Sequence, residues 1–255
     1  MLRIDLSGNT ALVTGATGEL GRAIVRTLAQ CGADVAIHYL RNQGQAEALL
    51  ADIEAYGVGG MTVQADVTHL PSVMTMRDTV GRTLGAPHIL VNNAVIQYQP
   101  WTHVLDQAPE DYESQFRSCV LQNVFMAKAF VPAMMEAHYG RIIAVNTECA
   151  MQNLPGQSAY IAGKRGMDGV VRVLAKEIGV HQITVNQVAP GWTISDRVRR
   201  EGSERQAGYE ASVALQRRGE DQEIANVVAF LASNLASYIT GAYIPVCGGN
   251  VMPAI

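Results

Sequence analysis

The sequence contains few cysteines, and its histidines are scattered. Cys31, Cys119, Cys149 and Cys247 are the four cysteines in 255 residues, and no two form a C-x-x-C pair. This usage is typical of a reducing compartment and argues against a disulfide framework. The six histidines show no spacing such as H-x-x-x-H, so we expect no metal site.

The chain also lacks a basic run, a long apolar run and a signal-like beginning. The formal net charge is -4, and acidic residues follow the nearest basic cluster, Arg197, Arg199 and Arg200. We interpret that cluster as a solvated face and expect no nucleic-acid or membrane partner. Residues 1–12 lack the charged and apolar regions of a signal peptide, and no apolar run is long enough to span a bilayer. These features favour a cytoplasmic protein.

Apolar residues are plentiful and follow an alternating pattern. Hydrophobic residues make up 48% of the chain and charged residues 16%, which is typical of a globular protein. Short apolar runs cover residues 11–13, 35–37, 61–63, 89–91, 141–145, 183–188 and 242–246, and stretches of helical period cover 20–30, 43–56, 72–84, 111–137, 158–179 and 221–233. Strand and helix in alternation predict an α/β fold: a Rossmann-type doubly wound parallel sheet of seven strands with helices on both faces. We find no linker or repeat, so residues 1–255 are predicted to form a single domain.

Polar and turn-forming residues follow most of the predicted strands. They are Thr14–Gly15, residues 39–41, Asp66, Asn92–Asn93, Asn146–Thr147 and Pro190–Gly191. In a doubly wound sheet the ligand lies at the carboxyl ends of the strands, where the strand order reverses. These residues are therefore candidates for the rim of a site.

A glycine-rich loop follows the first predicted strand and opens a helix. Gly15, Gly18 and Gly21 allow a tight turn and a close approach of the backbone to a pyrophosphate. The helix that follows offers free N–H groups to the phosphates. An ordinary turn is the alternative, and the position between a strand and a helix favours a dinucleotide loop.

The second strand indicates which dinucleotide binds. An NAD site usually has a carboxylate there for the ribose 2′-OH, whereas an NADP site has a cation for the 2′-phosphate. The strand ends in His38-Tyr39-Leu40-Arg41, without an acid. NADP(H) is therefore favoured over NAD(H), although Arg41 could also be an exposed arginine without a partner. Asp66 is placed to accept a hydrogen bond from the adenine amino group.

Tyr160 and Lys164 are one helical turn apart on a predicted helix, so their side chains share a face. A phenol has a pKa of about 10 and needs a nearby positive charge to work at neutral pH. Tyr-x-x-x-Lys also occurs as a surface pair, but Thr147 at the end of the fifth strand could hold a substrate oxygen beside the phenol. Thr147 could instead cap that strand. Ser158 is a competing hydroxyl that should point to another helix face.

Together these residues resemble the short-chain dehydrogenase/reductase family, in its branch of about 250 residues. The resemblance rests on the glycine loop, residues 92–94, Tyr160 with Lys164, Pro190–Gly191, residues 238–241 and Gly248–Gly249. Within the family, residues 159–164 and 223–249 are most similar to 3-oxoacyl-carrier-protein reductases and sugar or polyol dehydrogenases. The family implies hydride transfer between NAD(P)H and a carbonyl, with tyrosine as general acid/base. It also implies a lysine that holds the ribose and lowers the tyrosine pKa, and a strand-five hydroxyl that steadies the substrate.

The resemblance implies a set of contacts for the cofactor. We expect them at Gly15, Thr17, Gly18, Glu19, Leu20, Tyr39, Arg41, Asp66, Val67, Asn93, Ala94, Tyr160, Lys164, Pro190, Gly191, Thr193 and Ser195. Catalysis is assigned to Tyr160, Lys164 and Thr147.

The sequence departs from the family at several places. Glu19 occupies the position of the middle glycine of the loop, and its charge would repel phosphates unless it points to solvent. Val95 replaces a glycine, Thr147 replaces the usual serine, and Cys247 replaces a common aspartate. The asparagine of the catalytic tetrad, which orders water for proton supply, is replaced by Cys119, with Asn123 a turn away.

The substrate is expected between three segments. Residues 192–219 form a long connection that predicts a substrate-covering lid. The walls are expected to include Tyr98, Trp101, Met151, Leu154 and Trp192. This pocket would suit a small-molecule carbonyl or alcohol, and an acyl thioester, a sugar and a cyclic ketone all remain open.

The predicted helix 111–137 is apolar on almost every side. A helix that covers a sheet needs only one apolar face, so the surplus indicates burial against another subunit, with core packing as the alternative. A homodimer or homotetramer fits the family.

Three functions compete. The leading one is an NADP(H)-dependent oxidoreductase that acts on a carbonyl/secondary alcohol pair. A catalytically weak nucleotide-binding regulatory or scaffold protein on the same fold is the alternative, motivated by Glu19, Val95 and Cys119. The spacing of the glycines also fits a dehydratase or epimerase, but those proteins carry a larger carboxyl-terminal domain.

Overall fold

The computed structural model describes residues 3–96, 101–202 and 206–252. Its centre is a seven-stranded parallel sheet in the order β3-β2-β1-β4-β5-β6-β9. The strands are β1 (Thr10–Val13), β2 (Asp34–Tyr39), β3 (Gly60–Gln64), β4 (Ile89–Asn92), β5 (Gly140–Val145), β6 (Ile183–Pro190) and β9 (Tyr243–Val246). The predicted doubly wound α/β fold and its seven strands are confirmed.

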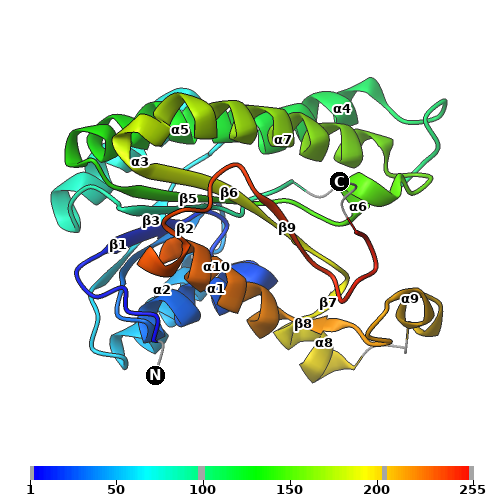
Figure 1. Ribbon diagram of the computed structural model, residues 1–255, viewed down its shortest axis with the longest axis horizontal. Helices are drawn as coiled ribbons and strands as arrows, with labels where there is room; N and C mark the ends of the chain where they lie inside the picture. Colours follow the sequence, from blue (N-terminus) through cyan, green and yellow to red (C-terminus); the bar gives the residue numbers. More distant parts are fainter. Residues whose placement is uncertain (1–2, 97–100, 203–205, 253–255) are drawn as a thin grey trace.

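Helices cover both faces of this sheet (Figure 1). On one face lie α1 (Glu19–Gln30), α2 (Gln43–Glu54) and α10 (Asp221–Ala232), and on the other lie α3 (Leu70–Thr83), α5 (Gln122–Ala137) and α7 (Ser158–Ile178). Each face has its own apolar core. Because both faces are covered, the central strands β1, β4 and β5 are buried along their whole length, whereas the edge strand β9 is half-buried throughout. This burial explains why the central strands are continuous apolar runs in the sequence.

The predicted helix 111–137 is interrupted. It consists of α4 (Pro109–Gln115), a π-helical turn η1 (Phe116–Leu121) and α5. A π-helical turn accommodates an extra residue within a helix and often lies at a functional site. The apolar pattern runs through this turn, and the expectation of one regular α-helix was therefore wrong.

Short elements complete the chain. The segment after β6 contains β7 (Thr193–Ile194), α8 (Asp196–Glu201), α9 (Ala207–Ser212) and β8 (Gly219–Glu220), and α6 (Cys149–Gln152) follows β5. Two 3-10 turns, η2 (Gly179–His181) and η3 (Asn234–Ala236), end α7 and α10. The strands β7 and β8 pair in parallel outside the main sheet. Figure 1 shows this segment at the lower right, on the side where α6 also lies.

The strand order reverses beside β1. The chain runs outward from β1 to β2 and β3, and then from β4 to β9 on the other side. The carboxyl ends of β1 and β4 therefore flank the switch point, where doubly wound sheets bind their ligands. The candidate site is built from these ends and from the end of β5.

Candidate active site

The glycine loop is folded tightly against the end of β4. Gly15 has a φ of +60°, and a Cβ there would lie 2.9 Å from the Cα of Ala94. A Cβ on Gly21 would lie 2.4 Å from the carbonyl oxygen of Gly15. Gly18 is the N-cap of α1 and offers no side chain to the first turn, whose N–H groups remain available to a phosphate. The loop therefore fits the pyrophosphate of a dinucleotide.

Thr14 fastens this loop to the residues after β4. Its hydroxyl accepts hydrogen bonds from the backbone N–H groups of Asn93 (2.9 Å) and Ala94 (3.0 Å). The Asn93 amide in turn donates to the carbonyl oxygens of Thr14 (3.0 Å) and Gly15 (3.1 Å). Asn93 and Ala94, predicted as cofactor contacts, thus support the loop from the side of β4. The sequence alone gave no reason to assign this role to Thr14.

His38 supports the loop from the other side. Its Nδ1 accepts from the N–H of Gly15 at 3.0 Å, and its Nε2 lies 3.0 Å from the carbonyl oxygen of Ala65. These partners require the neutral ring with the proton on Nε2. Burial lowers the pKa of His38, which favours the same neutral form. The sequence placed His38 at the end of the second strand but did not predict this contact with the glycine loop.

Glu19 is neutralised locally. Its carboxylate forms an ion pair with Arg22 at 2.8 Å, and Arg22 also donates to the carbonyl oxygen of Thr17 at 2.8 Å. The negative charge of Glu19, which stands where the family has a glycine, is therefore balanced by Arg22 within the same helix. Leu20, the next residue of α1, packs partly buried against the core.

The ends of β2 and β3 present the residues expected around the adenosine. Tyr39 is buried, and Arg41 is exposed beyond it. Within the described part of the chain, the Arg41 guanidinium forms no ion pair. Asp66 is exposed, and its Oδ1 accepts from the N–H and hydroxyl groups of Thr68 at 2.8 and 2.7 Å. Val67 is buried.

Thr147, Tyr160 and Lys164 come together at the end of β5. Tyr160 and Lys164 lie one turn apart near the start of α7, and the Lys164 Nζ is 5.8 Å from the centroid of the Tyr160 ring. Lys164 is buried and donates to the carbonyl oxygen of Val145 at 2.6 Å. The Thr147 hydroxyl accepts from the N–H of Cys149 at 3.2 Å and lies close enough to Tyr160 to lower the pKa of the phenol. The position of Thr147 is fixed through its carbonyl oxygen, which accepts from the Tyr243 hydroxyl at 2.6 Å.

Burial pushes the two titratable groups in opposite directions. It raises the pKa of Tyr160 well above the ordinary phenol value, negative charge on the neighbouring Cys119 or Cys149 would raise it further, and the Thr147 hydroxyl lowers it. Burial lowers the pKa of Lys164. In the protein alone, Tyr160 is therefore a protonated phenol at neutral pH.

Ser158 does not compete with Thr147. Its hydroxyl pairs with the hydroxyl of Tyr112 at 2.6 Å, so it faces α4 as the helical spacing predicted.

The loops after β6 reach the same end of the sheet. Pro190 accepts from the N–H of Glu148 at 3.0 Å, and Gly191 donates to Val246 at 3.1 Å. Thr193 begins β7, and Ser195 is the N-cap of α8, with its hydroxyl accepting from the N–H of Val198 at 3.5 Å.

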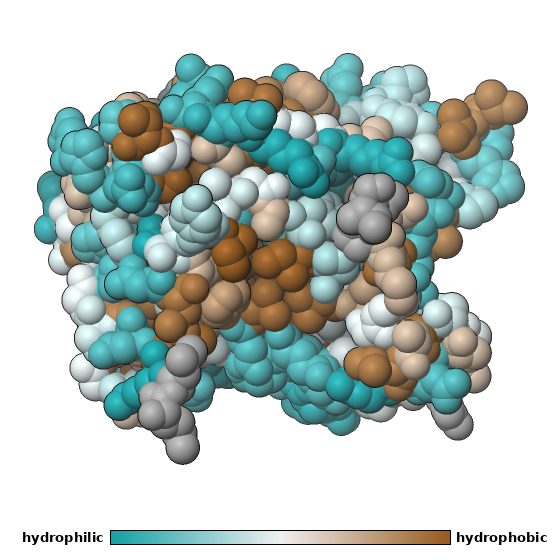
Figure 2. Space-filling model, in the orientation of Figure 1, coloured by the Kyte–Doolittle hydropathy of each residue, from teal (hydrophilic) through white to brown (hydrophobic). Residues whose placement is uncertain are grey.

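The predicted substrate wall is partly exposed. Trp101, Leu154 and Trp192 are 54%, 39% and 49% exposed, and Met151 is half-buried on α6. Trp101 lies beside Gly156, next to the Leu154 turn. Tyr98 lies outside the described residues. Figure 2 shows a hollow on the right-hand side of the molecule, between the part that carries α4 and α6 and the part that carries α8 and α9.

Comparison with known proteins identifies this architecture. A family model described as enoyl-(acyl carrier protein) reductase matches residues 15–250. The chain belongs to the short-chain dehydrogenase/reductase family. It is 36% identical over 250 residues to the 3-oxoacyl-[acyl-carrier-protein] reductase FabG of Pseudomonas aeruginosa and 37% identical over 250 residues to FabG of Escherichia coli. Each alignment covers 98% of this chain and 100% of the relative.

Two solved structures share the fold of this short-chain dehydrogenase/reductase. LugOII, a promiscuous reductase that catalyses keto-reduction at C1 during lugdunomycin biosynthesis, superposes with a TM-score of 0.89 at 30% identity, covering 97% of this chain and 99% of its own. A blue fluorescent protein from a metagenomic library, in complex with NADPH, superposes with a TM-score of 0.89 at 33% identity, covering 97% and 100%. The predicted family and fold are confirmed.

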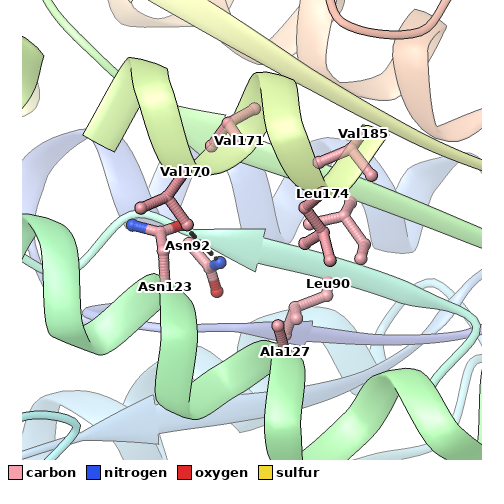
Figure 3. Close-up of a pocket in the computed structure, with 9 residues that line it drawn as sticks. Leu90, Asn92, Asn123, Ala127, Val170, Val171, Leu174 and Val185 are labelled. Carbon is pink, nitrogen blue, oxygen red and sulfur yellow. Dashed lines mark hydrogen bonds between the residues drawn. The ribbon is translucent and has the colours of Figure 1, made fainter. Parts of the chain in front are cut away.

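The position of the family's tetrad asparagine lies in the π-helical turn. Cys119 is buried there, and its Sγ donates to Gln115 Oε1 at 3.8 Å. Asn123, one turn on, does not replace the missing amide: it donates to the carbonyl oxygen of Cys119 (2.7 Å) and accepts from Asn92 (2.8 Å). Figure 3 shows Asn92 and Asn123 side by side, joined by this hydrogen bond, in the lining of a small cavity between the sheet, α5 and α7. This cavity is lined mainly by aliphatic side chains, and Thr147, Tyr160 and Lys164 are not among its lining residues.

Two further findings concern metal sites and membrane-spanning helices. Among the residues that the structure describes, no cluster of histidine, cysteine or acidic side chains could hold a metal ion. Within the same residues, Pro109–Ala137 is the one helical stretch long and apolar enough to pass as a membrane span, and 56% of its apolar window is buried inside the protein.

Proposed function

We propose that this short-chain dehydrogenase/reductase is an NADP(H)-dependent oxidoreductase that interconverts a carbonyl and a secondary alcohol. The observation that carries the proposal is the grouping of Thr147, Tyr160 and Lys164 at the end of β5. A bound nicotinamide would supply the hydride for reduction or accept it for oxidation.

The residues of the chain have distinct roles in this proposal. The Tyr160 hydroxyl donates its proton to the substrate oxygen as that oxygen gains negative charge. The Thr147 hydroxyl holds the same oxygen beside the phenol. Lys164 lies behind Tyr160, where its ammonium favours the phenolate that remains after proton transfer.

We propose NADP(H) over NAD(H) because of the residues at the end of β2. Arg41 is exposed there, beyond the buried Tyr39, and the strand end carries no carboxylate. The Gly15–Gly21 loop would hold the pyrophosphate, and Asp66 would hold the adenine. The NADPH complex of a structural neighbour that is 33% identical supports the same choice.

The substrate is proposed to be a small-molecule carbonyl that enters between α6 and residues 192–219. The relatives named FabG are 3-oxoacyl-[acyl-carrier-protein] reductases, and LugOII is a keto-reductase. A 3-oxoacyl thioester is therefore the first substrate to test, and a cyclic ketone is the second.

The decisive experiment measures NADPH oxidation at 340 nm with both substrates, using the wild type and Tyr160→Phe. We expect turnover in the wild type and a loss of at least about 100-fold in the variant, since general acid catalysis contributes at least this much. Tight NADPH binding without turnover on either substrate would instead favour the nucleotide-binding regulatory or scaffold protein.

We also propose a cytoplasmic homodimer or homotetramer. Phe116 and Val173 leave about half of their surface exposed on η1 and α7. On another face, Figure 2 shows apolar residues gathered over α10 and β9, where Val227, Phe230 and Ile244 are partly buried. Light scattering coupled to size exclusion tests this assembly, and a monomer at micromolar concentration would refute it.

A further inference from the structure

Glu148 follows the catalytic Thr147 directly and is 2% exposed. Its two carboxylate oxygens have different partners. Oε1 accepts from the hydroxyl of Tyr209 at 2.8 Å, and Oε2 accepts from the side-chain amide of Asn250 at 3.0 Å. These partners come from α9 and from the turn after β9, so one buried carboxylate joins two segments that are distant in sequence.

The hydrogen bonds continue into residues 192–202 and 206–219, which we call the cover segment. The Tyr209 hydroxyl accepts from the N–H of Trp192 at 2.8 Å, and the two aromatic rings meet edge to face at 5.6 Å. Ser212, one turn along α9, donates to the Asn250 Oδ1 at 3.0 Å. The start of the cover segment and two residues of α9, Tyr209 and Ser212, are thereby linked to Glu148, directly or through Asn250.

Two glycines make room for this arrangement. A Cβ on Gly191 would lie 2.5 Å from the hydroxyl oxygen of Tyr209. A Cβ on Gly248, whose φ is +62°, would lie 2.7 Å from a methyl group of Val213. The absence of a side chain at Gly191 and Gly248 therefore lets the cover segment pack closely against the backbone at both positions.

A buried carboxylate is costly unless it is well hydrogen-bonded. Burial raises the pKa of Glu148, and the bonds from Asn250 and Tyr209 lower it. No ion pair to Glu148 is present in the described part of the chain. An apolar residue would fill the same space at a lower desolvation cost, so packing alone does not account for the acid.

We propose that Glu148 is a positioning residue that holds α9 and Trp192 against the active-site wall, next to Thr147. This inference rests on the proposed reductase function, because the segment it holds is the proposed substrate cover. Glu148 does not take part in proton transfer. Its loss weakens substrate binding and leaves the chemical step nearly intact.

The experiment combines Glu148→Gln and Tyr209→Phe, singly and together. Glutamine keeps the shape of the side chain but offers one acceptor oxygen where the carboxylate offers two. Phenylalanine removes the hydroxyl that joins Glu148 to Trp192. Tyr56→Phe is the matched control, since it removes a phenol that is hydrogen-bonded to Gln30 just beyond α2.

The first readout is steady-state kinetics with the carbonyl substrate. We expect each single variant to raise the substrate KM about tenfold, as for the loss of a hydrogen bond to a charged group, with kcat within about threefold of the wild type. The double variant should be no worse than the more affected single variant, because both changes break one chain of bonds. A fall in kcat at unchanged KM, or additive effects of the two changes, would overturn the proposal.

The second readout does not require catalysis. Arg217 lies in the cover segment just after α9, and its side chain is 52% exposed, so trypsin cleavage there, followed by mass spectrometry, reports release of α9. Both single variants should be cleaved several times faster than the wild type and Tyr56→Phe. Cleavage at the wild-type rate would refute the role of Glu148. Faster cleavage in a protein without reductase turnover would support that role and reject the proposed function instead.

Discussion

Gly163 and Gly169 lie in the same helix, α7, and the structure predicts opposite effects when each is changed to alanine. A Cβ on Gly163 would lie 2.9 Å from the carbonyl oxygen of Gln115, at the end of α4, whereas a Cβ on Gly169 meets nothing within 4 Å. Replacing an exposed helical glycine with alanine gains about 0.5–1 kcal/mol. Gly169→Ala should therefore stabilise the protein by that amount.

At Gly163 the same gain is offset by overpacking, which costs about 1–3 kcal/mol when the neighbour cannot move easily. The neighbour here is backbone beside the π-helical turn, so we expect Gly163→Ala to lose about 1–2 kcal/mol. For a chain of this size, 1 kcal/mol corresponds to about 2–4 °C in Tm. Gly163→Ala should thus lower the Tm by about 2–8 °C, and Gly169→Ala should raise it by about 1–4 °C.

The assay is thermal unfolding followed by far-UV circular dichroism, at one protein concentration and one scan rate. Activity gives a second comparison, because Gly163 lies between Tyr160 and Lys164. Displacing α7 by a few tenths of an ångström should lower kcat in Gly163→Ala and leave Gly169→Ala unaffected. Shifts of the same sign for both variants, or a Gly163→Ala protein as stable as the wild type, would refute this account of how α7 is seated.

The remaining predictions concern the cofactor, the proton and pH. Arg41→Ala should raise the KM for NADPH about 10–100-fold, the loss expected for charge-assisted hydrogen bonds, and leave NADH nearly unchanged; equal effects would overturn the NADP assignment. Thr147→Val keeps the shape of the side chain but should lower kcat about 100-fold, and an unchanged rate would remove Thr147 from the mechanism. Lys164→Met should lower kcat at least as much while the fold, checked by circular dichroism, is retained. Burial lowers the pKa of His38 in the folded protein, whereas the histidine has a pKa of about 6.5 in the unfolded chain. Below that pH the unfolded state therefore binds more protons than the folded state. The free energy of unfolding should decrease as the pH falls below about 6.5. His38→Gln should flatten that decrease and the exposed His103→Gln should not; equal pH profiles would contradict the assignment.

The fold could be predicted from sequence because a parallel sheet that is covered on both faces leaves a clear pattern. Buried strands such as β1 and β5 are short apolar runs, and each crossover needs a helix between them. The positions of the site residues followed from the same pattern, since the residues after the strands share one edge of the sheet. Thr147 was found in this way at the end of β5.

Other features left no pattern to read. The π-helical turn adds one residue to a helix whose apolar residues continue on both sides, so periodicity did not reveal it. Glu148 and Asn250 are 102 residues apart, and nothing in either local sequence indicates that they meet. The roles of Thr14 and His38 depend likewise on partners brought together by the sheet. The residues proposed for catalysis were therefore predictable from local patterns, whereas the groups that hold their surroundings in place were not.

Burial sets the protonation state of the proposed general acid in the protein alone. Burial raises the pKa of Tyr160 and lowers that of Lys164, so the phenol keeps its proton in the protein alone. A negative charge on Cys119, which replaces the family's asparagine, would also raise the pKa of Tyr160, but the neutral thiol carries no such charge. Carbonyl reduction requires the protonated phenol, whereas alcohol oxidation requires the phenolate. In the protein alone the phenol therefore holds the proton that carbonyl reduction requires, and the substitution at position 119 removes the amide that would order water near Lys164.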